Sequence, residues 1–194
     1  MEFKDVVRGR RSVRKYLAKK IDRSVLNEVL EDAMWAPSGV NIQPWHFVVA
    51  ESDEAMAKVL ELMRKAAVID APHLHERFQK NPEVAKNSLG FIADLGGAPT
   101  AIMAFQGKDE YPLMEDGVIE SVSAAIENLV LSAYDHGLST CWLTAPMQAD
   151  MDYEFRDAFA PGKGRMLAII CIGYAEESKI PKAPARKDGR VEFI

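Results

Sequence analysis

The stretch VIESVSAAIENLVLSAYDH, residues 118–136, indicates the fold class more clearly than any other part of the sequence. Its apolar side chains recur every three or four residues, which is the spacing of one buried helical stripe; they are Val118, Val122, Ala125, Ile126, Leu129 and Ala133. Gly137 follows directly and predicts the helix end, because glycine readily adopts the left-handed conformation found there. Ala124 and Val130 make much of the opposite face apolar too. We therefore expect a central helix with a second face that can pack against another subunit.

Apolar and β-branched segments on both sides of this helix predict strands. The expected strands are WHFVVA (45–50), TAIMAFQ (100–106), LSTCWLT (138–144) and MLAIICIGYA (166–175). The last is an unbroken apolar run, as expected of a strand that is covered on both faces. Further helices are expected at 2–8, from the Asp22 cap to before Pro37, from the Ser52 cap to about residue 66, and at 150–159. Prolines and the Gly96-Gly97 pair predict broken helix and loop over 68–98.

Four strands interleaved with helices, without an internal repeat or a linker, predict one α+β domain over residues 1–194. No apolar run reaches the roughly 18 residues that span a membrane, and the charged first 20 residues lack the apolar core of a signal peptide. We expect a cytoplasmic protein that does not bind membranes. The net charge of -5 and the pI near 5.5 argue against nucleic-acid binding. Cys141 and Cys171 are interpreted as reduced core residues, with a disulfide as the open alternative.

The segment RRSVRKY, residues 10–16, places four cationic side chains in seven positions of this acidic chain. A ligand that carries a phosphate would explain them, yet neither G-x-G-x-x-G nor a Walker sequence is present. PGKGR (161–165) has the wrong spacing for a phosphate loop. The His73-x-His75 pair lacks further ligands at metal-binding spacing, so we predict no metal site. Without a G-x-S-x-G elbow or another nucleophile motif, a bound cofactor is expected to carry any reaction.

Four motifs in the same order resemble the flavin-dependent nitroreductase family over nearly the whole chain: RRSVRKY, APSGVNIQPWHFVVA (36–50), ENLVLSAYDHGLSTCWL (127–143) and IICIGYA (169–175), followed by a basic tail. R-x-S-x-R occurs by chance on many surfaces, whereas P-S-x-x-N-x-Q-P-W is far more specific. The resemblance implies an antiparallel-dominated sheet wrapped by helices. It also implies an intertwined homodimer with two FMN molecules at the subunit interface.

The resemblance assigns the cofactor-binding residues in four groups. At the phosphate and the nearby flavin atoms it places Arg10, Arg11, Ser12 and Arg14. Along the flavin ring it places the backbone of Trp142, Leu143, Thr144 and Ala145, and at the phosphate, from the tail, Arg186 and Lys187. From the partner subunit, the flavin is approached by Pro37, Ser38, Gly39, Asn41 and Gln43. Charge agrees with the first group, because a phosphate monoester carries about -1.5 to -2 charges and pairs well with guanidinium forks. In an extended segment, residues 10, 12 and 14 point the same way. The alternatives are a solvated basic turn, a helix-stop loop at 37–43 and a disordered basic tail.

The function implied by the resemblance is a ping-pong oxidoreductase. NAD(P)H gives hydride to flavin N5, and a nitroaromatic, a quinone or an activated enone then accepts it, with no catalytic side chain required. Two alternatives stay open: the same fold with flavin fragmentation or reductive dehalogenation, and a flavin-binding protein without turnover. Residues 64–98 match no specific motif of the family, so the donor and acceptor residues are unassigned. His73, His75, Arg77 and Phe78 are candidates by location only.

Overall fold

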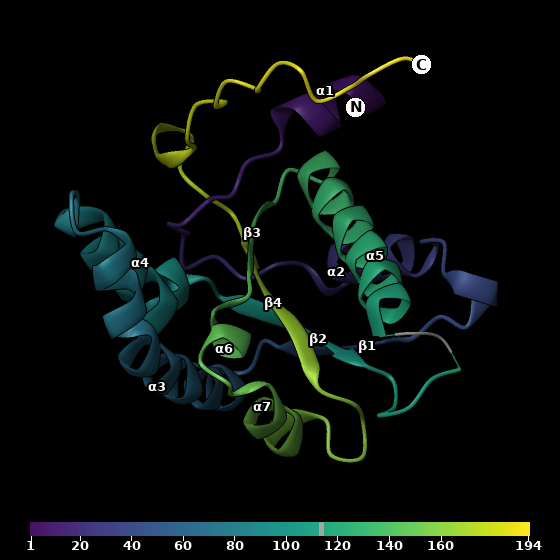
Figure 1. Cartoon of the computed structure of the whole chain (residues 1–194), viewed down its shortest axis with the longest axis horizontal. Coiled ribbons are helices and arrows are strands. Elements are labelled where there is room, and N and C mark those ends of the chain that lie inside the picture. Colours follow the sequence, from purple (N-terminus) through teal and green to yellow (C-terminus); the bar gives the residue numbers. More distant parts are fainter. Residues whose placement is uncertain (113–114) are drawn as a thin grey trace.

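A computed structural model of the chain describes residues 1–112 and 115–194. Its sheet is built from β1 (Trp45–Ala50), β2 (Thr100–Gln106), β3 (Ser139–Leu143) and β4 (Met166–Gly173). In space the order is β1-β2-β4-β3, and every neighbouring pair is antiparallel (Figure 1). The expected strands and the expected antiparallel sheet are thereby confirmed.

Helices cover both faces of this sheet (Figure 1). The helices of the described residues are α1 (Phe3–Gly9), α2 (Arg23–Met34), α3 (Asp53–Arg77), α4 (Pro82–Asp94), α5 (Glu115–Asp135), α6 (Ala145–Gln148) and α7 (Asp152–Phe159), with 3-10 turns at Gly39–Asn41, Leu95–Gly97 and Glu177–Lys179. Helices α2 and α5 pack on one face, whereas α3, α4, α6 and α7 pack on the other. The central helix is α5, and Gly137 follows it with a positive φ of 75°, as the sequence predicted.

The two inner strands carry the core because both of their faces are covered. Every residue of β2 is buried. Ile102 of β2 and Ile170 of β4 lie in the cluster with α2 and α5, whereas Met103 and Ile169 lie in the cluster with α3 and α4. This two-sided burial explains why the last strand has an unbroken apolar sequence instead of an alternating one.

The expected helix end near residue 66 is wrong, and the broken helix and loop expected over 68–98 hold only at residues 78–81 and after Asp94. Helix α3 runs 25 residues to Arg77 and contains Pro72, and α4 then occupies most of the remaining stretch. An internal proline removes one helical hydrogen bond and usually costs about 3 kcal/mol. Buried Ala66, Ala67 and Leu74 hold α3 against its neighbours on both sides of the proline, so packing outweighs the local preference. Pro82 opens α4, where its missing N–H would have no partner in any case.

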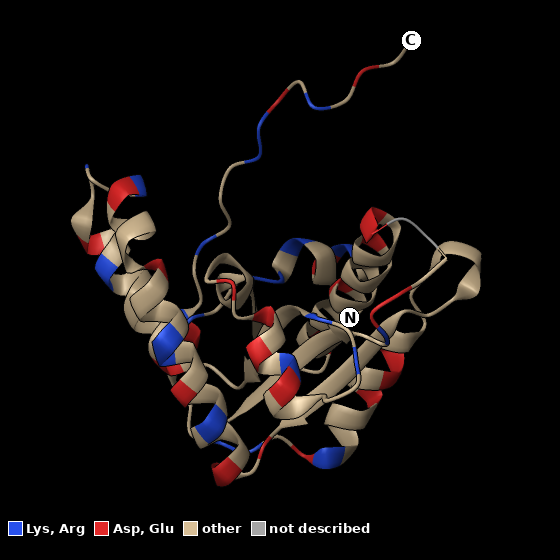
Figure 2. Cartoon of the chain, turned by 60° about the horizontal axis from the view of Figure 1, so that its bottom comes forward, with Lys and Arg blue, Asp and Glu red and all other residues tan. Residues whose placement is uncertain are grey.

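Charged residues lie on the helices and connecting segments, and the strands contain none (Figure 2). The chain after Ile180 is exposed at every residue, and in Figure 2 it extends away from the rest of the molecule. Within the residues that the structure describes, no helix is both long enough and apolar enough to cross a membrane.

Candidate functional site

The basic segment 10–16 continues the sheet beyond β3. Ser12 forms an isolated parallel bridge with Thr140, and the Val13 N–H donates to the Thr140 carbonyl at 2.9 Å. Val13 is buried, while Ser12 and Arg14 on either side of it are more exposed. The alternation follows from the extended backbone, because neighbouring side chains point in opposite directions. One apolar residue thus fixes the segment to the sheet edge and leaves its polar neighbours available.

Tyr16 and Gly96 hold the far end of this segment. The Tyr16 hydroxyl donates to the Val13 carbonyl at 2.8 Å and to the Cys171 carbonyl at 3.4 Å, and the Tyr16 N–H donates to the Gly96 carbonyl at 3.0 Å. Gly96 has a φ of 65°, and a Cβ at this position would lie 2.3 Å from the Arg14 carbonyl oxygen. The 3-10 turn at residues 95–97 therefore packs directly against the backbone of Arg14.

The three arginines of the segment differ in how their donors are used. Nη1 of Arg11 turns back to donate to the carbonyls of Arg8 and Arg10 at 2.7 and 2.5 Å. Nε of Arg10 is buried without a hydrogen-bond partner and forms only a long ion pair, at 4.0 Å, with the Glu127 carboxylate. Arg14 makes no ion pair with any residue that the structure describes, and its side chain donates only a long 3.4 Å bond to the Ser12 carbonyl. Arg10 and Arg14 therefore keep donors that an anion can use.

A cavity of about 180 Å³ opens beside Arg14. Three parts of the chain that lie far apart in sequence form its walls: the basic segment, helix α4, and the stretch from the end of β3 through α6. The lining residues are Arg14, Ser88, Phe91, Ile92, Cys141, Trp142, Leu143, Thr144, Ala145 and Gln148. One chain thus brings Arg14 together with all four residues expected along the flavin ring.

The loop 37–43 and the basic tail do not line this cavity. The loop packs on α5, where the Gly39 N–H donates to the Ser121 hydroxyl at 3.4 Å, and the Ser38 hydroxyl accepts from the Gln43 N–H at 3.0 Å. Three of its residues have positive φ, namely Val40, Asn41 and Gln43, although only Asn commonly tolerates this conformation. In the tail, Arg186 and Lys187 are exposed and make no hydrogen bond or ion pair with the described residues.

Sequence reasoning missed the contribution of α4. Ser88, Phe91 and Ile92 come from the stretch that could not be aligned with any family motif. A signal was present, because Ala85, Ser88 and Ile92 follow at helical spacing after a proline suited to a first helical position. His73 and His75 lie on α3 and do not line the cavity.

The two cysteines are buried and free, which confirms their interpretation as reduced core residues. They lie directly opposite each other in the pairing of β3 with β4. Burial raises the pKa of both thiols, and nearby Arg14 and Arg10 offset only part of this for Cys141. Both thiols are therefore protonated at neutral pH and are poor nucleophiles.

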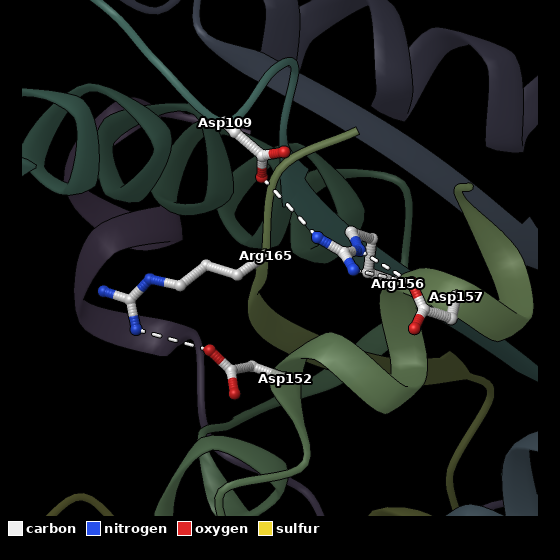
Figure 3. Close-up of polar contacts among 5 residues, drawn as sticks. All are labelled: Asp109, Asp152, Arg156, Asp157 and Arg165. Carbon is white, nitrogen blue, oxygen red and sulfur yellow. Dashed lines mark hydrogen bonds and ion pairs between the residues drawn. The ribbon is translucent and has the colours of Figure 1, made fainter. Parts of the chain in front are cut away.

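A second cavity, of about 400 Å³, lies where β2 ends and β4 begins, and its charged groups make it unsuited to an anion. Arg165 in its wall pairs with Asp152 at 3.5 Å and also with Glu115. The neighbouring Arg156 pairs with Asp157 at 2.7 Å and with Asp109 at 3.7 Å (Figure 3). Carboxylates already neutralise these guanidinium groups, in contrast to Arg14.

The anchoring role of Tyr16 predicts a dependence of stability on alkaline pH. Burial raises the pKa of the Tyr16 phenol far above its ordinary value of about 10. The folded state therefore keeps a proton that the unfolded state loses above pH 10, and stability should fall there by up to about 1.4 kcal/mol per pH unit. Tyr16→Phe should be about 1 kcal/mol less stable at pH 8, because the Val13 carbonyl loses its donor. Urea unfolding from pH 8 to 11 should show this difference shrinking above pH 10, whereas a constant difference would exclude the anchoring role.

The fold is that of an α+β protein, an antiparallel sheet wrapped by helices, and Arg14 at the sheet edge offers an anion its donors beside a cavity. The nitroreductase family model matches residues 7–174, and the chain belongs to this family. The chain is 27% identical over 192 residues to the putative NAD(P)H nitroreductase YfhC of Bacillus subtilis. The alignment covers 98% of this chain and 92% of that protein.

Solved structures share the fold over the whole chain. A BluB-like flavoprotein from Clostridium difficile 630 is 26% identical, with a TM-score of 0.78 and coverage of 100% of this chain and 99% of that one. A nitroreductase from Bacteroides fragilis, solved with bound FMN, is 23% identical, with a TM-score of 0.77 and the same coverage. The fold expected from the sequence, that of the nitroreductases, is confirmed.

Proposed function

We propose that the protein is an FMN-dependent oxidoreductase that passes hydride from NAD(P)H to nitroaromatic, quinone or similar acceptors. The observation that carries the proposal is Arg14, which pairs with no carboxylate of the described residues and lines a cavity together with residues 142–145. The family membership and the FMN held by the Bacteroides protein of the same fold support the choice of ligand. In this proposal residues 1–194 form a single FMN-binding domain.

The residues around the cavity fit such a ligand. A buried Arg10 Nε without a hydrogen-bond partner and an Arg14 without a carboxylate are the donors that a phosphate dianion needs. Ser12 lies between them on the same extended segment and can donate its hydroxyl. Residues 142–145 would lie along the ring, and backbone N–H groups there would stabilise charge that develops on it. In this proposal Arg186 and Lys187 reach the phosphate from the tail.

The second half of the site would come from another copy of the chain. The loop 37–43 is strained and exposed, with Val40 81% accessible, and Trp35 just before it is 80% accessible. Strained backbone persists where the surrounding structure holds it for a function, and an exposed tryptophan is typical of an interface core. We propose a homodimer in which Pro37, Ser38, Gly39, Asn41 and Gln43 face the partner's flavin.

Bound FMN would supply the hydride chemistry, with NAD(P)H as donor and the acceptor following at the same face. The chain's contribution is to hold the cofactor and shape the cavity. No side-chain acid or base is needed for hydride transfer, and the neighbouring Cys141 thiol stays protonated.

Steady-state kinetics with a nitroaromatic and with a quinone test the reaction. Double-reciprocal plots at several NADPH concentrations, and again with NADH, should give parallel lines, because the donor product leaves before the acceptor binds. Flavin should be recovered intact after many turnovers. Converging lines would contradict the ping-pong order. Stoichiometric loss of flavin would contradict the proposed reaction and indicate flavin fragmentation instead.

A further inference from the structure

Helix α4 and the turn that follows it contact Arg14 at both its side chain and its backbone. The Arg14 guanidinium carbon lies 5.7 Å from the centre of the Phe91 ring. Leu95, the first residue of the 3-10 turn that follows α4, takes a left-handed conformation, and Gly96 packs on the Arg14 carbonyl. The Gly96 carbonyl also accepts from the Tyr16 N–H at 3.0 Å. One structural unit therefore determines where the Arg14 backbone runs and where its side chain points.

Phe91 is itself held firmly. It is only 9% exposed and belongs to the core cluster that fills the space between α3, α4 and the sheet. Arg14 is exposed and lacks an ion pair among the described residues, so the ring face is the main contact that orients its guanidinium. An arginine over an aromatic face is attracted by the electron-rich ring, while its N–H groups remain free at the edge.

We propose that Phe91 is a positioning residue that aligns Arg14 for the FMN phosphate before the cofactor arrives. Holding the guanidinium in its bound orientation reduces the entropic cost of binding. The inference rests on the proposed function for the identity of the ligand. It adds an apolar residue of α4 to the determinants of affinity for a charged group.

A double-mutant cycle tests this role. Phe91→Leu should weaken FMN binding about two- to fivefold in the wild-type background, the effect of one cation–π contact. The same substitution should have no effect in an Arg14→Ala background, because it acts through Arg14. Phe91→Tyr retains the ring and should restore the wild-type affinity. Phe159→Leu is the matched control, since Phe159 is a core-packed ring on α7 that also lies near a cation, Lys58. It should leave FMN affinity unchanged.

A second readout requires no flavin. In NMR spectra of the full-length chain without added FMN, the Arg14 Nε–H signal, assigned by its loss in Arg14→Lys, should show a ring-current shift. The shift should disappear in Phe91→Leu and remain in Phe91→Tyr. An Arg14 signal that is identical in wild type and Phe91→Leu would overturn the inference, as would equal losses of FMN affinity in both backgrounds. A wild-type chain that takes up no FMN would instead overturn the proposed function, and the NMR comparison would still decide the role of Phe91.

Discussion

Replacing Arg14 by alanine is expected to lower the affinity for FMN by roughly 10- to 100-fold. A hydrogen bond to a charged group contributes about 1.5–3 kcal/mol, and 1.4 kcal/mol corresponds to a factor of ten in the dissociation constant. Arg14 makes no competing ion pair with the described residues, so its guanidinium can bind a phosphate without first leaving a carboxylate. Quenching of flavin fluorescence during titration measures the dissociation constant directly.

Arg156→Ala is the control for this substitution. It also removes one guanidinium group, near the second cavity, but Asp157 and Asp109 already neutralise that group. Its FMN affinity should equal that of the wild type. The wild-type dissociation constant should rise with salt, and that of Arg14→Ala should rise less steeply, because one phosphate contact is missing. Wild-type affinity in a folded Arg14→Ala protein would contradict the assignment of the basic segment to the FMN phosphate.

Gly96→Ala is expected to destabilise the fold by about 2–5 kcal/mol. Part of this is the cost of about 1–2 kcal/mol for a non-glycine residue at a left-handed position. The rest comes from the methyl group, which would lie 2.3 Å from the Arg14 carbonyl oxygen and must push the basic segment off the sheet edge, at the 1–3 kcal/mol typical of overpacking. Denaturant unfolding without flavin gives the free energy, and FMN affinity should fall as well.

Gly137→Ala separates these two contributions. Gly137 has a φ of 75°, close to that of Gly96, yet nothing lies within 4 Å of a Cβ built on it. Its substitution should cost only the conformational part, about 1–2 kcal/mol, and should leave FMN affinity alone. If the two variants lose equal stability, the close packing of residues 95–97 against Arg14 is not significant.

The elements with a strong local pattern could be predicted from the sequence. The stripe from Val118 to Ala133 specified α5, and the unbroken run at 166–175 specified a strand covered on both faces. The helix content of residues 68–98 was underestimated because prolines and glycines are local signals, whereas the burial of Ala66 and Leu74 in the core beside α4 is a tertiary effect. A proline inside α3 is tolerated only because the whole helix is packed.

The candidate site divides in the same way. The charge of residues 10–14 can be read locally, whereas the segment 142–145 was assigned only from the resemblance to the nitroreductases. The structure places Arg14 and this segment in the wall of the same cavity. Phe91 was missed because nothing in its own neighbourhood marks it as more than a core residue. Its proximity to Arg14 joins residues 77 positions apart, which only the folded chain displays.

Arg14, with Arg10 beside it in the basic segment, is proposed to hold FMN at a place where NAD(P)H reduces it. The most direct measurement is the visible absorbance spectrum of the protein mixed with FMN and freed of excess ligand, followed by anaerobic addition of NADH or NADPH. We expect retained flavin bands near one FMN per chain, bleached by at least one of the two donors and restored by a nitroaromatic or a quinone. A protein that retains no flavin would contradict the role of the arginines, and flavin that neither nucleotide bleaches would contradict the proposed reaction.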